Sequence, residues 1–283
     1  MKIAVFGAGG SIGRMIVREA LARGHQVRAV VRDVAHFTAV EPRVEPRLTV
    51  VHGDATDAAS IAAAATGVDA VVNAVSPRPS KSGKATSSLT AVARAFIAGL
   101  PRAGVTRLII IGGAGSLLMP NGKMHVDEPD FPDIYKPEAL AQRDALDVYR
   151  AEAGVLDWTY ISPAGVIMPG ARTGQYRVGG NHLLVDATGK SLISIEDYAV
   201  AVVDLIERPA HLRLDHAGPD STSPDDETLV DQVLHRAPHG RPGEPHLVSQ
   251  RDLVVELRPV RDLAAFDGVL EVLSHLEVQR HWT

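Results

Sequence analysis

The chain has no cysteine among its 283 residues, which excludes disulfide bonds, thiolate metal ligands and a cysteine nucleophile. Aromatic residues make up only 4% of the chain while hydrophobic residues make up 45%, so the interior must consist mainly of Ala, Val, Leu and Ile, as in buried parallel sheets. No apolar run approaches the ~20 residues that cross a bilayer. The first apolar run already starts at Lys2, which leaves no room for a signal peptide, and we expect a cytoplasmic protein.

Charge is nearly balanced along the chain. There are 29 Lys and Arg against 34 Asp and Glu, with no block of like charge, so we expect neither nucleic acid nor a membrane as partner. Seven of the twelve histidines follow residue 210, but Pro238 interrupts the only pair at helical spacing, His235 and His239. No metal site is predicted.

The first thirty-three residues carry the clearest motif. A buried strand is predicted at Lys2–Phe6, a glycine-rich turn at 7–13, a helix at Arg14–Arg23 and a second strand at Gln26–Val31. A glycine-rich turn between a strand and a helix is typical of dinucleotide-binding folds, where a pyrophosphate meets the free N–H groups of the helix N-terminus.

Each glycine of this turn has an expected role. Gly7 permits the tight turn, Gly9 or Gly10 lets the backbone approach the phosphates, and Gly13 lets the helix pack against the strand. Ser11 and Ile12 lie within the same run. We therefore expect all six of these residues to contact the cofactor.

The residues after the second strand address the choice of cofactor. An acidic side chain at this position accepts hydrogen bonds from the ribose 2′-hydroxyl of NAD, whereas an arginine pairs with the 2′-phosphate of NADP. The sequence offers both types, Arg32 and Asp33. Since Arg32 directly follows the strand, its side chain should emerge at the carboxyl edge of the sheet, and NADP(H) is favoured over NAD(H).

The remaining strands and helices alternate, which predicts a Rossmann-type, doubly wound parallel sheet. Further strands are expected at Leu48–His52, Val68–Asn73, Thr106–Ile111 and Asp157–Ile161, and short hairpin strands at Gln175–Val178 and Leu183–Val185. Helices are expected through Ile61–Ala65 after a cap at Asp57, over Leu89–Leu100 and Glu138–Glu152, and from a cap at Ser194 to Ile206. Ligands of such sheets bind outside the carboxyl ends of the strands, which places Ala74, Val75, Gly112, Gly113 and Pro163 along the cofactor.

Three parts of the chain are predicted. The Rossmann domain with its substrate loops occupies 1–217, and its segment 118–137 is too long and too apolar for a bare connector, which suggests a substrate-covering loop. Residues 218–246 have the Pro, Gly and Ser content of a linker. Residues 247–283 predict a strand and a helix, a small α+β appendage that must pack on the main domain or on a second copy in a homodimer.

Four further segments sharpen this interpretation: Ile111–Leu117, Tyr135–Leu140, Asp157–Ala164 and Ser194–Ala201. With the Gly7-x-x-Gly10-x-x-Gly13 spacing, they resemble the atypical short-chain dehydrogenase/reductases, to which biliverdin-IXβ/flavin reductase and nitrogen-metabolite-repression-type NADP sensors are similar relatives. The resemblance covers about Met1 to Leu214. It implies that Asp54 binds the adenine amino group with Ala55 beside the ring, and that Ser116 matches the family's loop serine.

One departure from the family pattern concerns catalysis. Short-chain dehydrogenases carry Tyr-x-x-x-Lys at the start of the helix after the fifth strand, where the tyrosine is a general acid. In this chain those positions fall near Glu138 and Gln142, so the dyad is missing. Tyr135 stands nearby as an alternative proton donor or a packing residue, and Ser116 as an acceptor ligand or a plain turn residue.

These features predict an NAD(P)-dependent oxidoreductase, an NADPH-dependent reductase that transfers hydride to a planar flavin, quinone or conjugated carbonyl. Such acceptors can collect their proton from water, so the missing dyad does not exclude them. Two alternatives stay open: a non-catalytic NADP(H)-binding sensor, and a sugar-type epimerase or dehydratase.

Overall fold

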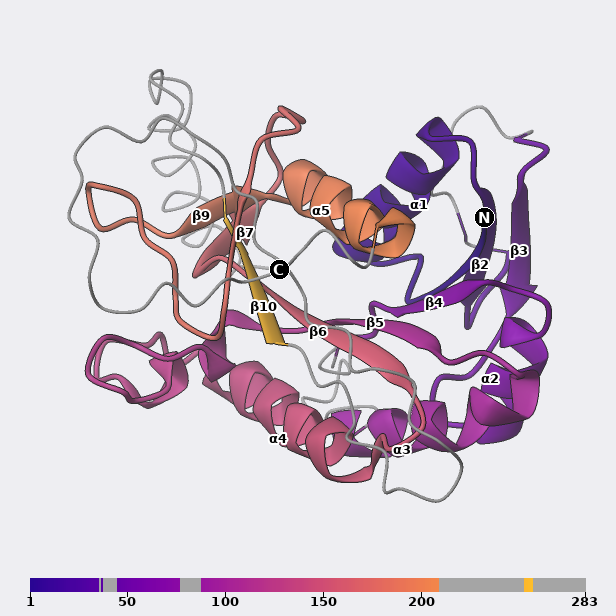
Figure 1. Ribbon diagram of the computed structural model, residues 1–283, viewed down its shortest axis with the longest axis horizontal. Coiled ribbons are helices and arrows are strands. Elements are labelled where there is room, and N and C mark those ends of the chain that lie inside the picture. The colour runs from indigo at the N-terminus through magenta and orange to yellow at the C-terminus, as the bar shows by residue number, and fades with distance from the viewer. Residues whose placement is uncertain (36, 38–44, 77–87, 209–251, 257–283) are drawn as a thin grey trace, which may run out of the picture.

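The computed structural model describes residues 1–35, 37, 45–76, 88–208 and 252–256. Its main sheet has eight strands in the order β3-β2-β1-β4-β5-β6-β10-β8 (Figure 1). The strands of this sheet are β1 (Lys2–Phe6), β2 (Gln26–Val31), β3 (Leu48–His52), β4 (Ala70–Asn73), β5 (Arg107–Ile111), β6 (Asp157–Pro163), β8 (Arg177–Gly179) and β10 (Asp252–Glu256). The pairings from β3 through β10 are parallel and only β8 is antiparallel to its neighbour, which confirms the predicted Rossmann-type sheet.

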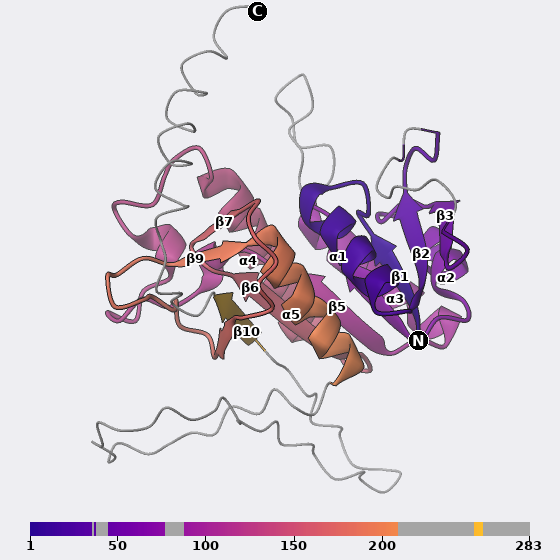
Figure 2. The same ribbon diagram turned by 90° about the horizontal axis from the view of Figure 1, so that it is seen from above.

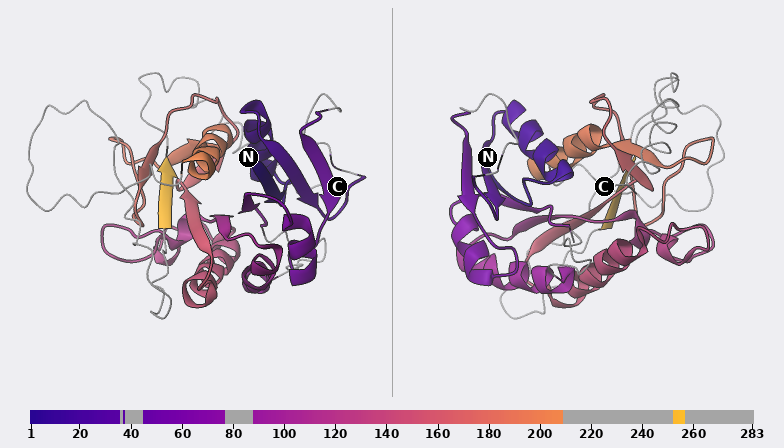
Figure 3. Two further views of the ribbon diagram at one scale, coloured as in Figure 1. Left: turned by 45° about the vertical axis from the view of Figure 1, so that its right-hand side comes forward. Right: turned by 180° about the vertical axis from the view of Figure 1, so that it is seen from behind.

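Helices cover both faces of this sheet. Figure 1 shows α1 (Ser11–Ala22) and α5 (Ile195–Glu207) on one face, and α2 (Ala58–Ala65), α3 (Leu89–Gly99) and α4 (Lys136–Glu152) on the other. The view from above in Figure 2 and the two views in Figure 3 agree that α1 and α5 lie side by side.

The two hydrophobic layers follow from the alternation of side chains along β1. Ile3 and Val5 pack into the cluster under α1 and α5, while Ala4 and Phe6 pack into the cluster under α2, α3 and α4. Both layers consist mostly of small and branched aliphatic residues. Trp158 on β6 is an exception, since it is fully buried in the second layer with its ring beside that of Tyr149.

The end of α1 explains the sharp turn into β2. Gly24 has a φ of 86° and donates to the carbonyl of Leu21, while the N–H of His25 donates to the carbonyl of Ala20. These two bonds form a Schellman motif, which favours glycine at the left-handed position. The predicted caps of two other helices are also confirmed, because the side chains of Asp57 and Ser194 accept N–H bonds at the starts of α2 and α5.

Several sequence predictions in the second half of the chain need correction. β6 runs on through Pro163, and the predicted strand at Gln175–Val178 is shifted to Arg177–Gly179 as β8. Leu183–Val185 is not a strand. A separate two-stranded sheet of β7 (Val166–Met168) and β9 (Leu192–Ser194) was not predicted, because three-residue strands are too short for an alternating pattern.

The predicted C-terminal appendage is described only at β10, which lies between β6 and β8 in the main sheet. The predicted linker at 218–246 and the predicted C-terminal helix lie outside the described residues. Within the described part of the chain, no helix combines the length and the apolar character needed to cross a membrane.

Candidate functional site

The glycine-rich turn joins β1 to α1 and presses against the loop after β4. Gly7 has a φ of 75°, and a Cβ atom on it would lie 2.4 Å from the carbonyl oxygen of Ala74. A Cβ atom on Gly13 would lie 2.3 Å from the carbonyl oxygen of Gly7. The protein itself therefore requires glycine at both positions.

Gly9 differs from Gly7 and Gly13. The nearest atom to a Cβ built on Gly9 is Val31 Cγ1 at 3.9 Å, an ordinary contact, and no positive φ is present there. Gly9 is exposed. The surrounding protein would thus accept a side chain at this position, and the absence of one leaves the backbone open to a ligand.

The N-terminus of α1 is arranged differently from those of α2 and α5. Gly10 occupies the cap position and offers no side-chain cap, and no acidic residue lies in the first turn. Ser11 is exposed and Ile12 partly exposed. N–H groups in the first turn of a helix have no carbonyl partner within it, so this end of α1 can receive an anion such as a phosphate.

Arg32 and Asp54 lie beyond the carboxyl ends of the neighbouring strands β2 and β3, whose last residues Val31 and His52 are register partners. Both side chains are exposed. The N–H and hydroxyl of Thr56 donate to Asp54 Oδ1 at 2.8 and 2.7 Å and lower the pKa of Asp54, and the charge of Arg32 acts in the same direction. In the described part of the chain both bonds are to Oδ1, so Oδ2 can still accept a bond from a ligand.

The predicted residues after β3 and β4 mainly offer apolar surface. Ala55 and Val75 are partly buried against the hydrophobic layer under α2 and α3. The N–H of Ala74 donates to the carbonyl of Phe6 at 3.0 Å, and the N–H of Val75 donates to Asn73 Oδ1 at 3.1 Å. Since these N–H groups are used inside the protein, a ligand would meet the side chains of this loop rather than backbone donors.

The loop after β5 rests on the ring of Tyr160. A Cβ atom on Gly112 would lie 2.0 Å from Tyr160 Cε1, so only glycine fits there. A Cβ atom on Gly113 would lie 3.5 Å from Cγ of Gln142 on α4. Ser116 Oγ donates to the carbonyl of Gly113 at 3.2 Å, which is the contact expected of a turn residue.

Two further predicted site residues, Pro163 and Tyr135, lie at the end of β6 and directly before α4. Pro163 is buried at the end of β6 and pairs with Val255 of β10, so it lies in a strand and not in the predicted loop. Tyr135 directly precedes α4 and is 57% exposed. No hydrogen bond joins Tyr135 to Ser116 among the described residues.

The positions of the missing dyad are occupied by Glu138 and Gln142 in the first turns of α4. Ser76 Oγ, after β4, donates to Glu138 Oε1 at 2.5 Å. Gln142 is buried, and its main-chain carbonyl accepts a hydrogen bond from the hydroxyl of Tyr160 at 3.3 Å. Sequence reasoning located Glu138 and Gln142 as replacements, but it did not identify Ser76 as the partner of Glu138.

The segment predicted to cover the substrate folds back on itself. Leu118 forms bridges to Met124 and to His182, and a short helical turn covers His125–Asp127. The ring of His125 meets that of Phe131 edge-on, and its Nδ1 is buried without a hydrogen-bond partner in the described part of the protein. The segment is therefore a folded element beside the loop after β5, and its role as a covering loop stays a prediction.

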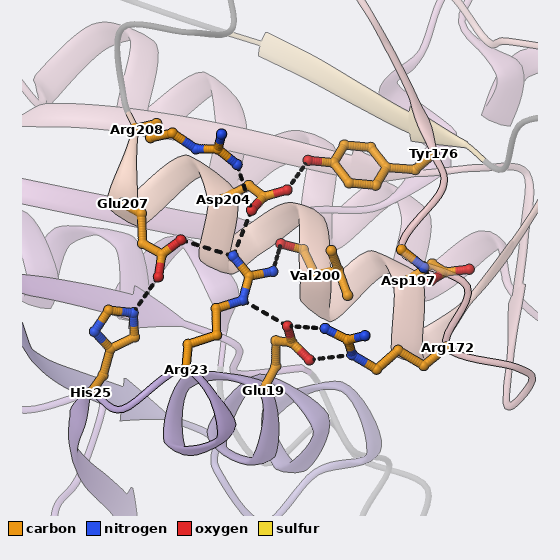
Figure 4. A network of polar contacts seen from close by, with 11 residues as sticks. Glu19, Arg23, His25, Arg172, Tyr176, Asp197, Val200, Asp204, Glu207 and Arg208 are labelled. Carbon is orange, nitrogen blue, oxygen red and sulfur yellow. Dashed lines mark hydrogen bonds and ion pairs between the residues drawn. The ribbon is translucent and has the colours of Figure 1, made fainter.

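A charged network at the other end of α1 was not predicted (Figure 4). Arg23 lies at its centre and donates to Glu19 at 2.7 Å, to Asp204 at 2.5 Å, to Glu207 at 2.9 Å and to the carbonyl of Val200 at 3.3 Å. Arg172 adds two bonds to Glu19, at 2.7 and 2.8 Å. The spacing of Glu19 and Arg23 was the only signal available in the sequence, because the partners on α5 lie far along the chain.

The same network fixes the segment between β7 and β8. Asp197 is fully buried, and its carboxylate accepts the N–H groups of Thr173 and Gly174 at 2.8 and 2.7 Å. Tyr176 donates its hydroxyl to Asp204, and burial together with this bond raises the pKa of Tyr176. Among the described residues no group of three His, Asp or Glu side chains could hold a metal ion.

The comparisons with known proteins agree with this geometry. The family described as NAD(P)H-binding matches residues 7–209. YwnB of Bacillus subtilis (strain 168), an uncharacterized protein, is 37% identical over 215 residues, which cover 75% of this chain and 94% of YwnB. A Bacteroides thetaiotaomicron protein assigned as an epimerase is 28% identical, with a TM-score of 0.70 and coverage of 92% of this chain and 99% of its own. A Streptococcus pneumoniae protein assigned as an NADH-flavin reductase is 27% identical, with a TM-score of 0.63 and coverage of 91% and 100%.

Proposed function

This chain belongs to the NAD(P)H-binding family, and we propose that it is an NADPH-dependent reductase that transfers hydride to a planar small-molecule acceptor. Membership in the family establishes a nicotinamide cofactor and a Rossmann oxidoreductase framework. The preference for NADPH, the acceptor and the residues that bind them are the proposed part.

Gly9 and the uncapped start of α1 carry the proposal. The protein would tolerate a Cβ atom at Gly9 and has no need of glycine there, whereas a pyrophosphate lying on the helix N-terminus would not tolerate one. Ser11, Ile12 and Gly13 then supply N–H groups to the phosphates, and the loops at Ala74 and Gly112 border the remainder of the cofactor. Asp54 accepts from the adenine amino group through its remaining oxygen.

Arg32 supports the choice of NADPH, because it is exposed beside Asp54 where the adenosine ribose of such folds lies. Replacing Arg32 by Ala should weaken NADPH binding about 10- to 100-fold, the ~1.5–3 kcal/mol of a charge-assisted contact, and change NADH binding far less. The dissociation constants of both cofactors would be measured by fluorescence titration. Arg102→Ala, at the opposite edge of the sheet before β5, is the matched control. Equal weakening of both cofactors by the Arg32 substitution would refute the 2′-phosphate assignment.

The reductase activity itself is tested with purified protein, NADPH and a panel of flavins, quinones, enones and aldehydes. We expect loss of NADPH absorbance with planar acceptors that can take their proton from water, since no Tyr-x-x-x-Lys pair is present in α4. The likeness to a protein assigned as an NADH-flavin reductase favours the same acceptors. Tight NADPH binding without turnover on any member of the panel would favour the sensor alternative.

An epimerase or dehydratase is the remaining alternative, and the likeness to a protein assigned as an epimerase supports it. Such an enzyme returns the hydride to its own substrate, so NADP(H) would not be consumed. Incubation with nucleotide sugars and analysis of the products would reveal it.

The proposed homodimer through residues 247–283 is tested by light scattering of the full-length chain over a range of concentrations.

A further inference from the structure

Ser76 and Glu138 form a polar pair between two loops at the carboxyl edge of the sheet. Ser76 lies two residues after Ala74, whose carbonyl oxygen rests against Gly7 of the glycine-rich turn. Glu138 precedes Ala139, whose side chain packs against Gly115 in the loop after β5. The hydrogen bond of 2.5 Å between them therefore links the β4 loop to the start of α4, beside the loops at Ala74 and Gly112 that border the proposed cofactor.

The protons of this pair define what it can bind. A serine hydroxyl has one proton, and Ser76 donates it to Glu138 Oε1. What remains on Ser76 is a pair of acceptor sites, and the second oxygen of the Glu138 carboxylate is an acceptor as well. Both residues are exposed, and Ser76 is the only hydrogen-bond partner that the described part of the chain provides for Glu138. From this pair of side chains, a ligand consequently meets acceptors and no donor.

This polarity is the reverse of that produced by a Tyr-x-x-x-Lys dyad, in which the tyrosine donates to the oxygen of a carbonyl substrate. Glu138 and Gln142 stand at the dyad positions. Gln142 is buried under the loop after β5, and its main-chain carbonyl accepts a hydrogen bond from the hydroxyl of Tyr160. A carbonyl oxygen facing Glu138 would be repelled by the carboxylate. An N–H or O–H group facing it would be bound, with the added strength of a charged acceptor.

We infer that Ser76 and Glu138 form a hydrogen-bond-accepting subsite, which selects acceptors that carry an N–H or O–H donor on the ring system that takes the hydride. The inference rests on the proposed reductase function and specifies its substrate class. The reaction balances as acceptor plus NADPH plus one proton giving reduced acceptor plus NADP⁺, with the hydride from NADPH and the proton from water. Ser76 and Glu138 bind and orient the acceptor and transfer no proton themselves.

The test uses three acceptors with the full-length chain: riboflavin, which has an N–H group in its ring, N3-methylriboflavin, which lacks it, and menadione, which has no donor. We expect kcat/KM to be at least about tenfold higher for riboflavin than for the N3-methyl compound, as for one charge-assisted hydrogen bond. In Glu138→Gln, whose amide can present a donor, this preference should disappear, and the ratio of riboflavin to menadione activity should fall about tenfold. Glu138→Asp should restore part of the preference, and Glu152→Gln at the far end of α4 is the matched control.

A second readout is independent of turnover. Oxidised riboflavin is titrated into the NADP⁺-loaded protein, and Glu138→Gln should weaken its binding about tenfold while leaving NADP⁺ affinity unchanged. Equal use of riboflavin and its N3-methyl derivative by the wild type, or an equal loss of riboflavin and menadione activity in Glu138→Gln, would overturn the subsite. If NADPH is bound and no acceptor is reduced, the reductase proposal fails, and the riboflavin titration still decides whether Glu138 binds a donor.

Discussion

The two ends of α1 differ in almost every respect. At the N-terminal end, Gly9 and Ser11 are exposed, Gly10 is partly exposed, and no side chain caps the helix. At the C-terminal end, Glu19 is 5% exposed and pairs with Arg23 and Arg172, while Arg23 is 19% exposed and pairs with Asp204 and Glu207 on α5. One helix thus separates a site that can receive a ligand from an anchor that is already fully occupied.

The ion pairs at the C-terminal end can fix the position of α1, while its N-terminal end remains available to a bound anion. Free N–H groups at one helix end bind an anion only if the helix itself does not move. The contacts of Glu19 and Arg23 with α5 and with Arg172 hold α1 in place without using any group at the ligand end. Substitutions at the two ends should therefore separate cofactor affinity from stability.

The largest expected effect concerns stability. Arg23→Ala leaves Glu19, Asp204 and Glu207 facing one another without their shared cation, and the free energy of unfolding should fall by about 3 kcal/mol. Urea denaturation measures this change, and Arg23→Lys should lose less because it keeps the charge. Cofactor affinity of the folded variant should stay within about twofold of the wild type. A tenfold weaker NADPH affinity in Arg23→Ala would show that the two ends of the helix are coupled.

The next effect concerns cofactor binding and separates two glycines. Gly9→Ala should weaken NADPH binding about 100-fold, or ~2.7 kcal/mol, with little change in stability, because the new methyl group meets only Val31 at 3.9 Å. Gly13→Ala should lose both stability and binding, because its methyl group would lie 2.3 Å from the carbonyl oxygen of Gly7. Thermal unfolding with and without NADPH measures both quantities. Unchanged NADPH affinity in Gly9→Ala would remove the main support for the phosphate site.

A smaller effect should appear in acid. Hydrogen bonds from Arg172 and then Arg23 lower the pKa of Glu19 against the opposing effect of burial. The stabilisation is therefore complete above the ordinary glutamate pKa of 4.5 and is lost as the pH falls below that value through the lowered pKa of the folded state. Glu19→Gln should be less stable than the wild type by about 2 kcal/mol at neutral pH, and the gap should narrow below pH 4.5. A constant gap across that range would contradict the ion-pair explanation.

The smallest effect is expected at Asp54. Asp54→Asn keeps an oxygen for the two bonds from Thr56 but turns an amide donor toward the adenine amino group. NADPH affinity should fall about tenfold, or ~1.4 kcal/mol, without loss of stability. Fluorescence titration of NADPH and of nicotinamide mononucleotide, which lacks adenine, gives the control. If both ligands are weakened alike, Asp54 does not contact adenine.

The parts of this fold that the sequence predicts are those specified by local pattern. Apolar runs such as Val68–Asn73 and Thr106–Ile111 predict buried parallel strands, which the structure shows as β4 and β5, and the caps Asp57 and Ser194 predict the starts of two helices. The glycine-rich turn is equally local. The strands β1 to β6 followed from these signals, while their order in the sheet comes from the structure.

The parts that could not be predicted depend on contacts between distant residues. Ser76 and Glu138 are 62 positions apart, and Arg172 and Glu19 are 153 apart, so no sequence window contains either pair. Pro163 was expected in a loop because the pairing that extends β6 comes from β10, almost at the other end of the chain. The hydrogen bond from Ser116 to Gly113 is local, and it matches the turn-residue alternative that the sequence left open.

The buried position of Trp158 gives the protein an optical property. Its indole lies on β6, fully enclosed beside Tyr149 of α4, and β6 ends at Pro163, one of the predicted cofactor contacts. The chain has two tryptophans, and the other, Trp282, lies outside the described residues. With Trp282 replaced by Phe, emission from Trp158 would be blue-shifted while the sheet is intact, and a bound dihydronicotinamide would absorb that emission. A single fluorophore would then report unfolding by its colour and cofactor occupancy by its intensity.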